Sequence, residues 1–276
     1  MANLYYGSVL SDNIRIQYYM TGEEKPSILL VHGFSDNGLS WNRIPVYLMK
    51  LYNVVIMDTR GHGFSGCGDE PFGLHDEARD IMAIVNQLQL VKPVIMGHSH
   101  GASMAATAAV DNPGIFAGLI LIDPPWGGTF DNQTLEDRQG SADEWRKVIG
   151  KMKRLSHDQL VRMGKRKYPA WDESEFFQWA QSKLQMQDNA MLSFMKPYDA
   201  LEDALPKITC PGLILTADPE KGAVVTPETV DRVKRLWNAV EVVHFPDAGH
   251  NLHRECYPEF ITAIDPFLKR IRRANM

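Results

Sequence analysis

Short runs of apolar residues alternate with longer amphipathic stretches along most of this 276-residue chain. Continuous apolar runs are typical of strands that are covered on both faces, because neither face of such a strand meets water. The amphipathic stretches repeat apolar positions with the period of a helix, as where Ala78, Ile81 and Val85 share one face. Strands that alternate with helices predict a mostly parallel sheet with helices on both faces. The expected strands are 27–31, 54–57, 94–96, 119–122, 213–216 and 240–245, and the expected helices are 41–51, 74–90, 227–237 and 257–273.

The first twenty residues follow a different pattern, in which polar and apolar residues alternate. Two alternating segments, 5–10 and 14–19, flank Ser11-Asp12-Asn13. Alternation with a period of two is typical of strands with one exposed face, and Asp and Asn favour tight hairpin turns. We therefore predict an antiparallel hairpin at the start of the sheet, which brings the expected number of strands to eight.

The buried-strand pattern stops near residue 127 and resumes near residue 206. Charged segments with a helical period fill the interval. The capping-box pattern Ser141-x-x-Glu144 predicts the start of one helix, and a second helix is expected over 172–186. A helical cap inserted after the sixth strand would lie over the carboxyl ends of the strands, where open α/β sheets bind their ligands. The expected boundaries are 1–126 and 206–276 for the core domain and 127–205 for the cap.

The composition is that of an ordinary soluble globular protein, with 44% hydrophobic and 23% charged residues. A net charge of −5 gives no reason to expect nucleic acid as a partner. Three scattered cysteines without a C-x-x-C pair indicate neither a disulfide framework nor a zinc site. The N-terminal residues do not resemble a signal peptide, and no apolar run approaches the roughly 20 residues of a membrane span. We therefore expect a cytoplasmic protein without a membrane partner.

The apolar run at 94–96 leads into the clearest chemical signal in the chain. It ends in Gly97-His98-Ser99-His100-Gly101, and an alanine-rich helical segment follows. A serine at the apex of a strand–turn–helix, with glycine two residues away on either side, is the pattern of a nucleophile elbow. The helix N-terminus directs backbone N–H groups at whatever the serine attacks. A serine hydroxyl also needs a base to remove its proton, and histidine is the usual base because it titrates near neutrality.

Four motifs at the ends of expected strands make the chain resemble the α/β-hydrolase fold family over nearly its whole length. They are HGF at 32–34, DTRGHGFS at 58–65, GHSHG at 97–101 and DAGH at 247–250. The resemblance implies an eight-stranded, mostly parallel sheet and a triad with Ser99 as nucleophile and His250 as general base. It also implies an oxyanion hole made by the backbone N–H groups of Phe34 and His100. The chain shows no metal or phosphate motif, so no cofactor is expected.

The acid of the triad has more than one candidate. Most members of the family carry it after the strand that follows the cap, where Asp218 comes early and Glu220 lies nearer the usual offset. Some members carry the acid one strand earlier, and Asp123 stands at that position. We favour Asp123, with Asp218 as the main alternative and Glu220 as the third. A carboxylate that is not the acid is expected to cap a helix or brace a loop.

Other residues near these motifs are assigned supporting roles. His253 is the rival of His250, and we place it at the surface or in a position that supports the base. His98 and His100 flank the serine and are expected to line the pocket, and Trp126 is expected to contact the substrate. The cap is rich in aromatic and methionine side chains, most of which will be core while a subset lines an apolar pocket. These are Phe130, Trp145, Trp171, Phe176, Phe177, Trp179, Met186, Met191 and Met195.

Two clusters of basic residues, within 146–154 and at 165–167, also fall in the cap. The simplest interpretation is a solvated helix face, and steering of an anionic substrate is the alternative.

These observations predict a cofactor-independent serine hydrolase, monomeric or homodimeric, with a helical cap. It would cleave an ester, lactone or related acyl bond of a small, apolar substrate through an acyl-enzyme intermediate. The same residues also suit a carbon–carbon hydrolase of vinylogous diketones, an acyltransferase or a ligand receptor that retains the triad. Since the nucleophile is serine rather than aspartate, we do not expect epoxide hydrolysis or dehalogenation.

Overall fold

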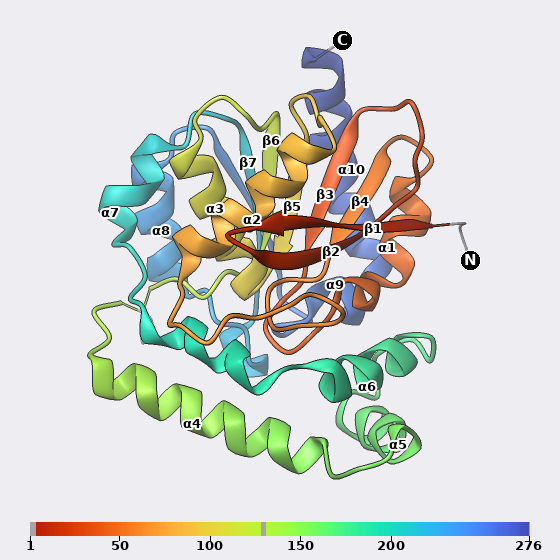
Figure 1. The fold of residues 1–276 in the computed structure, drawn as a ribbon. Helices are drawn as coiled ribbons and strands as arrows, with labels where there is room; N and C mark the ends of the chain where they lie inside the picture. The colour runs from red at the N-terminus through yellow and green to blue at the C-terminus, as the bar shows by residue number, and fades with distance from the viewer. Residues whose placement is uncertain (1–3, 128–130, 276) are drawn as a thin grey trace.

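The computed structural model describes residues 4–127 and 131–275, and its eight strands form one sheet in the order β1-β2-β4-β3-β5-β6-β7-β8 (Figure 1). The pairs β1–β2 and β2–β4 are antiparallel, and the other five pairs are parallel. The prediction of a mostly parallel, eight-stranded sheet is therefore confirmed. The strands are β1 (Tyr5–Ser11), β2 (Ile14–Met20), β3 (Ser27–Val31), β4 (Asn53–Met57), β5 (Val94–His98), β6 (Gly118–Ile122), β7 (Gly212–Ala217) and β8 (Val240–Phe245).

The first two strands form the expected hairpin. Asp12 and Asn13 occupy its turn with φ angles of 47° and 63°. Positive φ at both central residues is what a two-residue type I′ turn requires, and Asp and Asn tolerate it better than most residues do.

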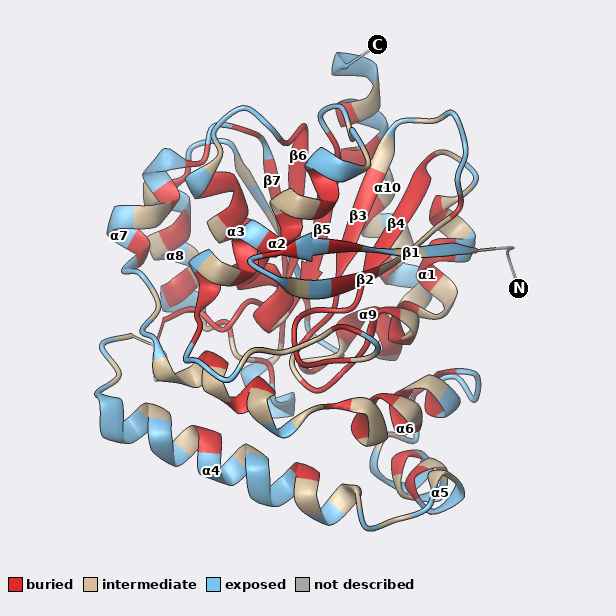
Figure 2. Cartoon of the chain, in the orientation of Figure 1, coloured by how far each residue is buried: buried red, intermediate tan, exposed pale blue. Residues whose placement is uncertain are grey.

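The central strands are buried because helices cover both faces of the sheet. Every residue of β3–β7 except Ser27 is buried (Figure 2). Alternate side chains go to opposite faces: Leu29 and Val31 belong to one apolar cluster, and Ile28 and Leu30 belong to the other. The first cluster contains residues of α2 (Leu74–Gln87), α3 (His100–Asp111) and α8 (Pro227–Leu236). The second contains residues of α1 (Arg43–Leu48), α9 (Leu252–Glu255) and α10 (Tyr257–Ala274).

A run of helices separates β6 from β7, which confirms the predicted helical insertion after the sixth strand. In Figure 1 the three longest of these helices, α4, α5 and α6, lie together below the ends of the strands, at the bottom of the view. The inserted helices carry two small apolar clusters, one around Met186 and Met191 and the other around Trp171 and Trp179. The elements are α4 (Leu135–Met152), α5 (His157–Lys167), α6 (Glu175–Gln185), η3 (Asp188–Met195), α7 (Leu201–Ala204) and η4 (Leu205–Lys207).

The start of α4 was predicted wrongly. The helix begins at Leu135, since Thr134 is its N-cap and the Thr134 side chain accepts a hydrogen bond from the Asp137 backbone N–H. Ser141 lies inside the helix, where its hydroxyl donates to the Asp137 carbonyl at 3.0 Å. Two capping boxes stood close together in the sequence, and the upstream one caps the helix. None of the helices among the described residues has the length and hydrophobicity needed to cross a bilayer.

The packing of α3 against β3 generates a stability prediction. A Cβ at Gly101 would lie 2.4 Å from the carbonyl oxygens of both Val31 and His32, which are backbone atoms. Gly101→Ala should therefore lower the free energy of unfolding by about 3 kcal/mol, as overpacking of a rigid core does. Thermal denaturation followed by circular dichroism measures the change. Gly140→Ala is the matched control, because Gly140 lies in α4 and a Cβ there would meet no neighbouring part of the described chain within 4 Å. Equal melting temperatures for the two variants would contradict the prediction.

Candidate active site

Ser99 lies at the sharp turn between the end of β5 and the start of α3. Its backbone has φ 53° and ψ −124°, a strained combination for a residue with a side chain. The Ser99 N–H donates to the Ile122 carbonyl at 2.8 Å, which ties the turn to the neighbouring strand β6. A Cβ at Gly97 would lie 2.2 Å from the Gly101 carbonyl oxygen, so this turn requires glycine. The sequence motif therefore does produce a nucleophile-elbow geometry.

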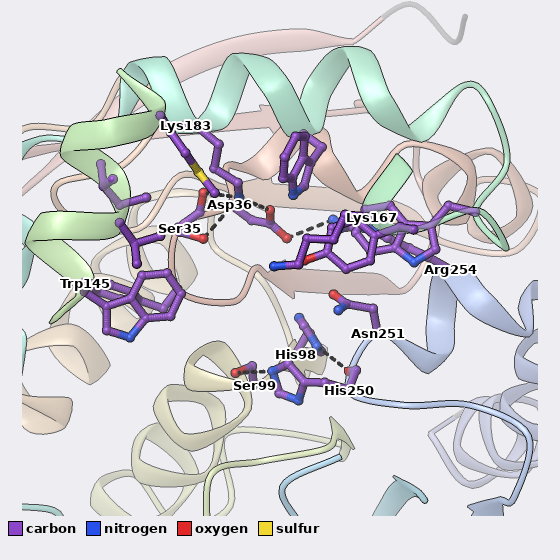
Figure 3. Close-up of a pocket in the computed structure, with 17 residues that line it drawn as sticks. Ser35, Asp36, His98, Ser99, Trp145, Lys167, Lys183, His250, Asn251 and Arg254 are labelled. Atoms are coloured by element: carbon purple, nitrogen blue, oxygen red, sulfur yellow. Dashed lines mark hydrogen bonds and ion pairs between the residues drawn. The ribbon is translucent and has the colours of Figure 1, made fainter. Parts of the chain in front are cut away.

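His250 connects Ser99 to Asp123 through the two nitrogens of its ring. The Nε2 atom lies 2.9 Å from Ser99 Oγ. A dashed line marks this contact in Figure 3. The Nδ1 atom lies 2.6 Å from Asp123 Oδ2. The Asp123 side chain is fully buried and also accepts the backbone N–H groups of Val224 (2.9 Å) and Val225 (3.1 Å). A buried carboxylate with three donors is held firmly in one orientation, and it fixes the orientation of the imidazole in turn.

The two alternative acids lie elsewhere in the hydrogen-bond network. Asp218 accepts the Glu220 backbone N–H at 3.0 Å and is the N-cap of η5 (Pro219–Lys221). Glu220 is exposed. Among the described contacts, Asp123 is the carboxylate that reaches His250. The loop after β7, where the family usually carries its acid, supplies N–H donors to Asp123 instead.

The loop after β3 runs against the elbow. A Cβ at Gly33 would lie 3.2 Å from the Cβ of Ser99. Among the hydrogen bonds of the described residues, the backbone N–H groups of Phe34 and His100 donate to no other protein group. Both amides are therefore free to bind an oxygen atom beside Ser99, as an oxyanion hole requires.

A buried lysine from the inserted helices holds this loop. Lys183 of α6 donates from Nζ to the Ser35 carbonyl (2.7 Å), to the Ser35 hydroxyl (3.1 Å) and to Asp36 Oδ1 (3.0 Å). The other oxygen of Asp36 accepts from Arg254 at 2.8 Å. Burial alone would raise the pKa of Asp36, but the positive charges of Arg254 and Lys183 hold it well below its usual range. Asp36 is thus a charged, buried bridge between α6 and α9.

The buried rings of His98 and His253 pack in a tilted arrangement beside His250. The rings of His98 and His253 lie 4.5 Å apart, and those of His98 and His250 lie 4.8 Å apart. Burial lowers the pKa of both His98 and His253 well below the usual value, so both are neutral. His98 Nε2 lies 2.9 Å from the His250 carbonyl, and a neutral His98 must therefore carry its proton on Nε2. A surface position for His253 was wrong, because its ring packs against Trp41 and His98.

The His100 side chain does not line the pocket as expected. Its Nε2 lies 2.8 Å from the Glu77 carboxylate, and its Nδ1 lies 2.9 Å from the Tyr198 hydroxyl. The ring is therefore held between α2 and the segment that follows η3. His100 is therefore not among the residues that line the cavity beside Ser99.

A cavity of about 190 Å³ lies between the elbow and the inserted helices (Figure 3). Ser99, His98 and His250 form one side of it. The other lining residues include aromatic and apolar side chains and cationic groups. These are Trp145, Val148, Ile149, Met152, Tyr168, Trp171 and Trp179, together with Lys167, Lys183 and Arg254.

Trp126, the expected substrate contact, is not among the residues that line this cavity. Trp126 is buried and packs in a core cluster that also contains Leu201 and Leu205. It lines a separate space of about 30 Å³. Leu201 of α7 and Leu205 of η4 line the same small space. Phe130, another expected pocket residue, lies outside the described residues.

Sequence reasoning missed Lys183 and Arg254 and assigned Lys167 mainly to a solvated face. All three line the cavity. Lys183 occupies a helix with no motif around it, and its partners lie 147 and 148 positions away in the chain. No local signal could have revealed that contact.

The sheet order and the serine at the turn after β5 define an α/β hydrolase. The chain belongs to the alpha/beta hydrolase family, whose family model matches residues 28–263.

Among curated proteins the chain is similar to N-formylmaleamate deformylase of Pseudomonas putida, with 25% identity over 95% of this chain and 96% of the relative. Among solved structures it resembles the N-formylmaleamic acid deformylase of Pseudomonas putida S16, with a TM-score of 0.76, 22% identity and coverage of 94% and 100% of the two chains. It also resembles E-2-(acetamidomethylene)succinate hydrolase, with a TM-score of 0.82, 20% identity and coverage of 97% and 100%. At these identities the structural matches establish the fold.

The buried contacts of Lys183 lead to a second stability prediction. Lys183→Met leaves the buried Asp36 with one cationic partner, and breaking a buried pair should lower the free energy of unfolding by about 3 kcal/mol. Urea denaturation measures this change. Lys153→Met is the matched control, since Lys153 pairs with the exposed Asp188 at 2.7 Å and such surface pairs contribute about 0–1 kcal/mol. A Lys183 variant as stable as its control would show that the buried pair contributes little.

Proposed function

We propose that this protein is a serine hydrolase that cleaves the acyl bond of a small substrate. The observation that carries the proposal is the chain of hydrogen bonds from Ser99 through His250 to Asp123 at the floor of the cavity. A hydroxyl, a base within hydrogen-bond reach and a buried acid that orients the base are the parts that nucleophilic acyl transfer requires.

The proposed reaction follows from this geometry. His250 Nε2 accepts the proton of Ser99 as Oγ attacks the substrate carbonyl carbon, and the carbonyl electrons move onto the oxygen. The N–H groups of Phe34 and His100 stabilise that oxyanion, and losing one such donor costs about 10²–10³ in kcat. His250 then gives the proton to the leaving group as the bond to it breaks. Water then attacks the acyl carbon while His250 Nε2 takes its proton, and His250 returns this proton to Ser99 Oγ as the acyl–oxygen bond breaks and the acid leaves. Asp123 keeps Nδ1 protonated and stabilises the imidazolium.

The relatives favour an amide as the natural substrate. One relative is named a deformylase of an N-formyl compound, and a structural neighbour is named a hydrolase of an acetamidomethylene compound. Both names denote an N-acyl group. We therefore propose that the bond is the C–N bond of a small N-acyl compound and that simple esters are accepted because they are more reactive. Carboxylic ester, lactone and carbon–carbon cleavage stay predictions from the sequence.

We also propose that 127–205 acts as a cap that defines the substrate range. Trp145, Ile149 and Met152 of α4 form part of the cavity wall opposite Ser99. The two apolar clusters within the inserted helices give the segment packing of its own. The cytoplasmic location and the monomeric or homodimeric state stay predictions.

The mechanism predicts an acyl-enzyme on Ser99. With p-nitrophenyl acetate, stopped-flow absorbance should show a burst of p-nitrophenol, and intact-protein mass spectrometry should detect an acetyl adduct that peptide mapping places on Ser99. Ser99→Ala should lose about 10⁶ in kcat while remaining folded, because removing the nucleophile leaves only the rest of the site. Turnover by this variant near the wild-type rate, or an adduct on another residue, would refute the proposal. Adduct formation followed by release would also separate a hydrolase from a receptor.

The choice of acid is tested by a pair of isosteric variants. Asp123→Asn should lower kcat for p-nitrophenyl acetate by about 10⁴, because the amide no longer selects the productive tautomer of His250. Asp218→Asn should stay within about threefold of wild type, since Asp218 caps η5. If Asp218→Asn is the more damaging change, or if both variants keep wild-type kcat, the assignment of Asp123 is wrong.

A further inference from the structure

The cavity above Ser99 carries more positive than negative charge. Three cationic side chains line it, Lys167, Lys183 and Arg254, and Asp36 is the one carboxylate among its lining residues. A small, partly enclosed space of this kind raises the local concentration of anions. The question is which of the cations is available to a ligand.

Two of the three cations are already matched by carboxylates. Lys183 is buried and uses its amine on Ser35 and Asp36. Arg254 donates to Asp36 at 2.8 Å, and its Nε lies 3.6 Å from Glu175. The Arg254 guanidinium also stacks over Trp171, with Cζ 4.7 Å from the ring centroid. These two side chains hold the cavity wall together.

Lys167, the last residue of α5, is different. It is exposed at the cavity, and its amine lies 5.1 Å from the centroid of the Tyr168 ring. In the part of the chain that the structure covers, no carboxylate lies within ion-pair distance of it. Figure 3 shows its side chain extending into the cavity from the side of Arg254. Lys167 is thus a cation at a binding cavity without a counter-ion among the described residues.

The charge of Lys167 also affects its neighbour Lys183 in the cavity wall. Burial is the main cause that lowers the pKa of Lys183, and the positive charges of Arg254 and Lys167 act in the same direction. Lys167 is therefore close enough to add to the positive potential of the wall. Arg254 Nε is buried and has no hydrogen-bond acceptor among the described residues. A bound anion would offset the excess of positive over negative charge among the residues that line the cavity.

We propose that the substrate carries a carboxylate group and that Lys167 binds it while the acyl group lies at Ser99. The second half of this statement rests on the proposed function. A charge-assisted contact between an ammonium and a carboxylate is stronger than a neutral hydrogen bond and also selects the substrate. The aromatic side chains Trp145 and Trp171 line the same cavity and suit the uncharged part of a short substrate. The substrate is then an anion with an apolar middle, rather than the wholly apolar molecule that the sequence suggested.

A lysine at the end of a helix also stabilises the helix through its dipole, whatever lies beside it. Arg166 occupies the same last turn of α5 and is exposed, but it does not line the cavity. Arg166 therefore contributes a positive charge to the same region but cannot touch a ligand in the cavity. Arg166→Met is thus the matched control for Lys167→Met.

Succinate and its neutral isostere succinamide test the proposal as inhibitors of p-nitrophenyl acetate hydrolysis. The inhibition constant of wild type should be at least about tenfold lower for succinate, as expected for a hydrogen bond to a charged group. Lys167→Met should reduce this preference to about twofold or less, and Arg166→Met should keep it. Equal inhibition of wild type by the two compounds would overturn the carboxylate site. Equal loss of the preference in both variants would overturn the contact with Lys167 and indicate long-range attraction only.

The same experiment separates this inference from the proposed function. Wild-type protein that folds but does not hydrolyse p-nitrophenyl acetate would contradict the serine hydrolase. Calorimetric titration of succinate and succinamide into that protein and into Lys167→Met would still decide the carboxylate site, because binding does not depend on turnover. Preferential binding of succinate that requires Lys167 supports the site, and binding without a preference refutes it.

Discussion

The site depends on how closely the turn between β5 and α3 packs against the end of β3. Gly101 lets the start of α3 approach the end of β3, and Gly97 lets the end of β5 approach α3, both at distances that a Cβ atom does not allow. That approach places Ser99 in a strained conformation at the tip of the turn. It also brings the loop with Phe34 beside the serine. The strain is maintained by the buried strands on either side, which cannot move without disrupting both apolar clusters.

Local patterns were enough to predict the sheet and the elbow, and the resemblance to the α/β-hydrolase fold family supplied His250 as the expected base. Apolar runs identify buried strands because both faces are covered, and Ser99 and His250 stand at strand ends in recognisable motifs. The acid was ambiguous because Asp123 and Asp218 both follow a strand. In the structure, the His250 ring contacts Asp123, and the backbone N–H groups of the loop after β7 also donate to Asp123, whereas Asp218 caps η5. A sequence does not display the direction of a backbone N–H group.

The cavity wall could not be predicted for a different reason. Lys183 and Arg254 acquire their roles from Asp36, which is distant from both of them in the chain. Trp126 looked like a substrate contact because it follows β6, but burial against Leu201 and Leu205 fixes it elsewhere. Such roles arise from packing between elements, and the helical period shows only that each helix has an apolar face.

The bridge through Asp36 joins residues that are synthesised at very different times, because Asp36 lies near the start of the chain and Arg254 near its end. Ser99 and Asp123 are synthesised in the first half of the chain, but His250 and Arg254 lie within the last thirty residues. A nascent chain that has already formed β3, β5 and β6 therefore has Ser99 without the imidazole of His250, and Asp36 without the guanidinium of Arg254. In the proposed mechanism, hydrolysis therefore requires the C-terminal segment to have docked, so the last part of the chain to be synthesised completes both the Asp36 bridge and the hydrogen bonds to Ser99.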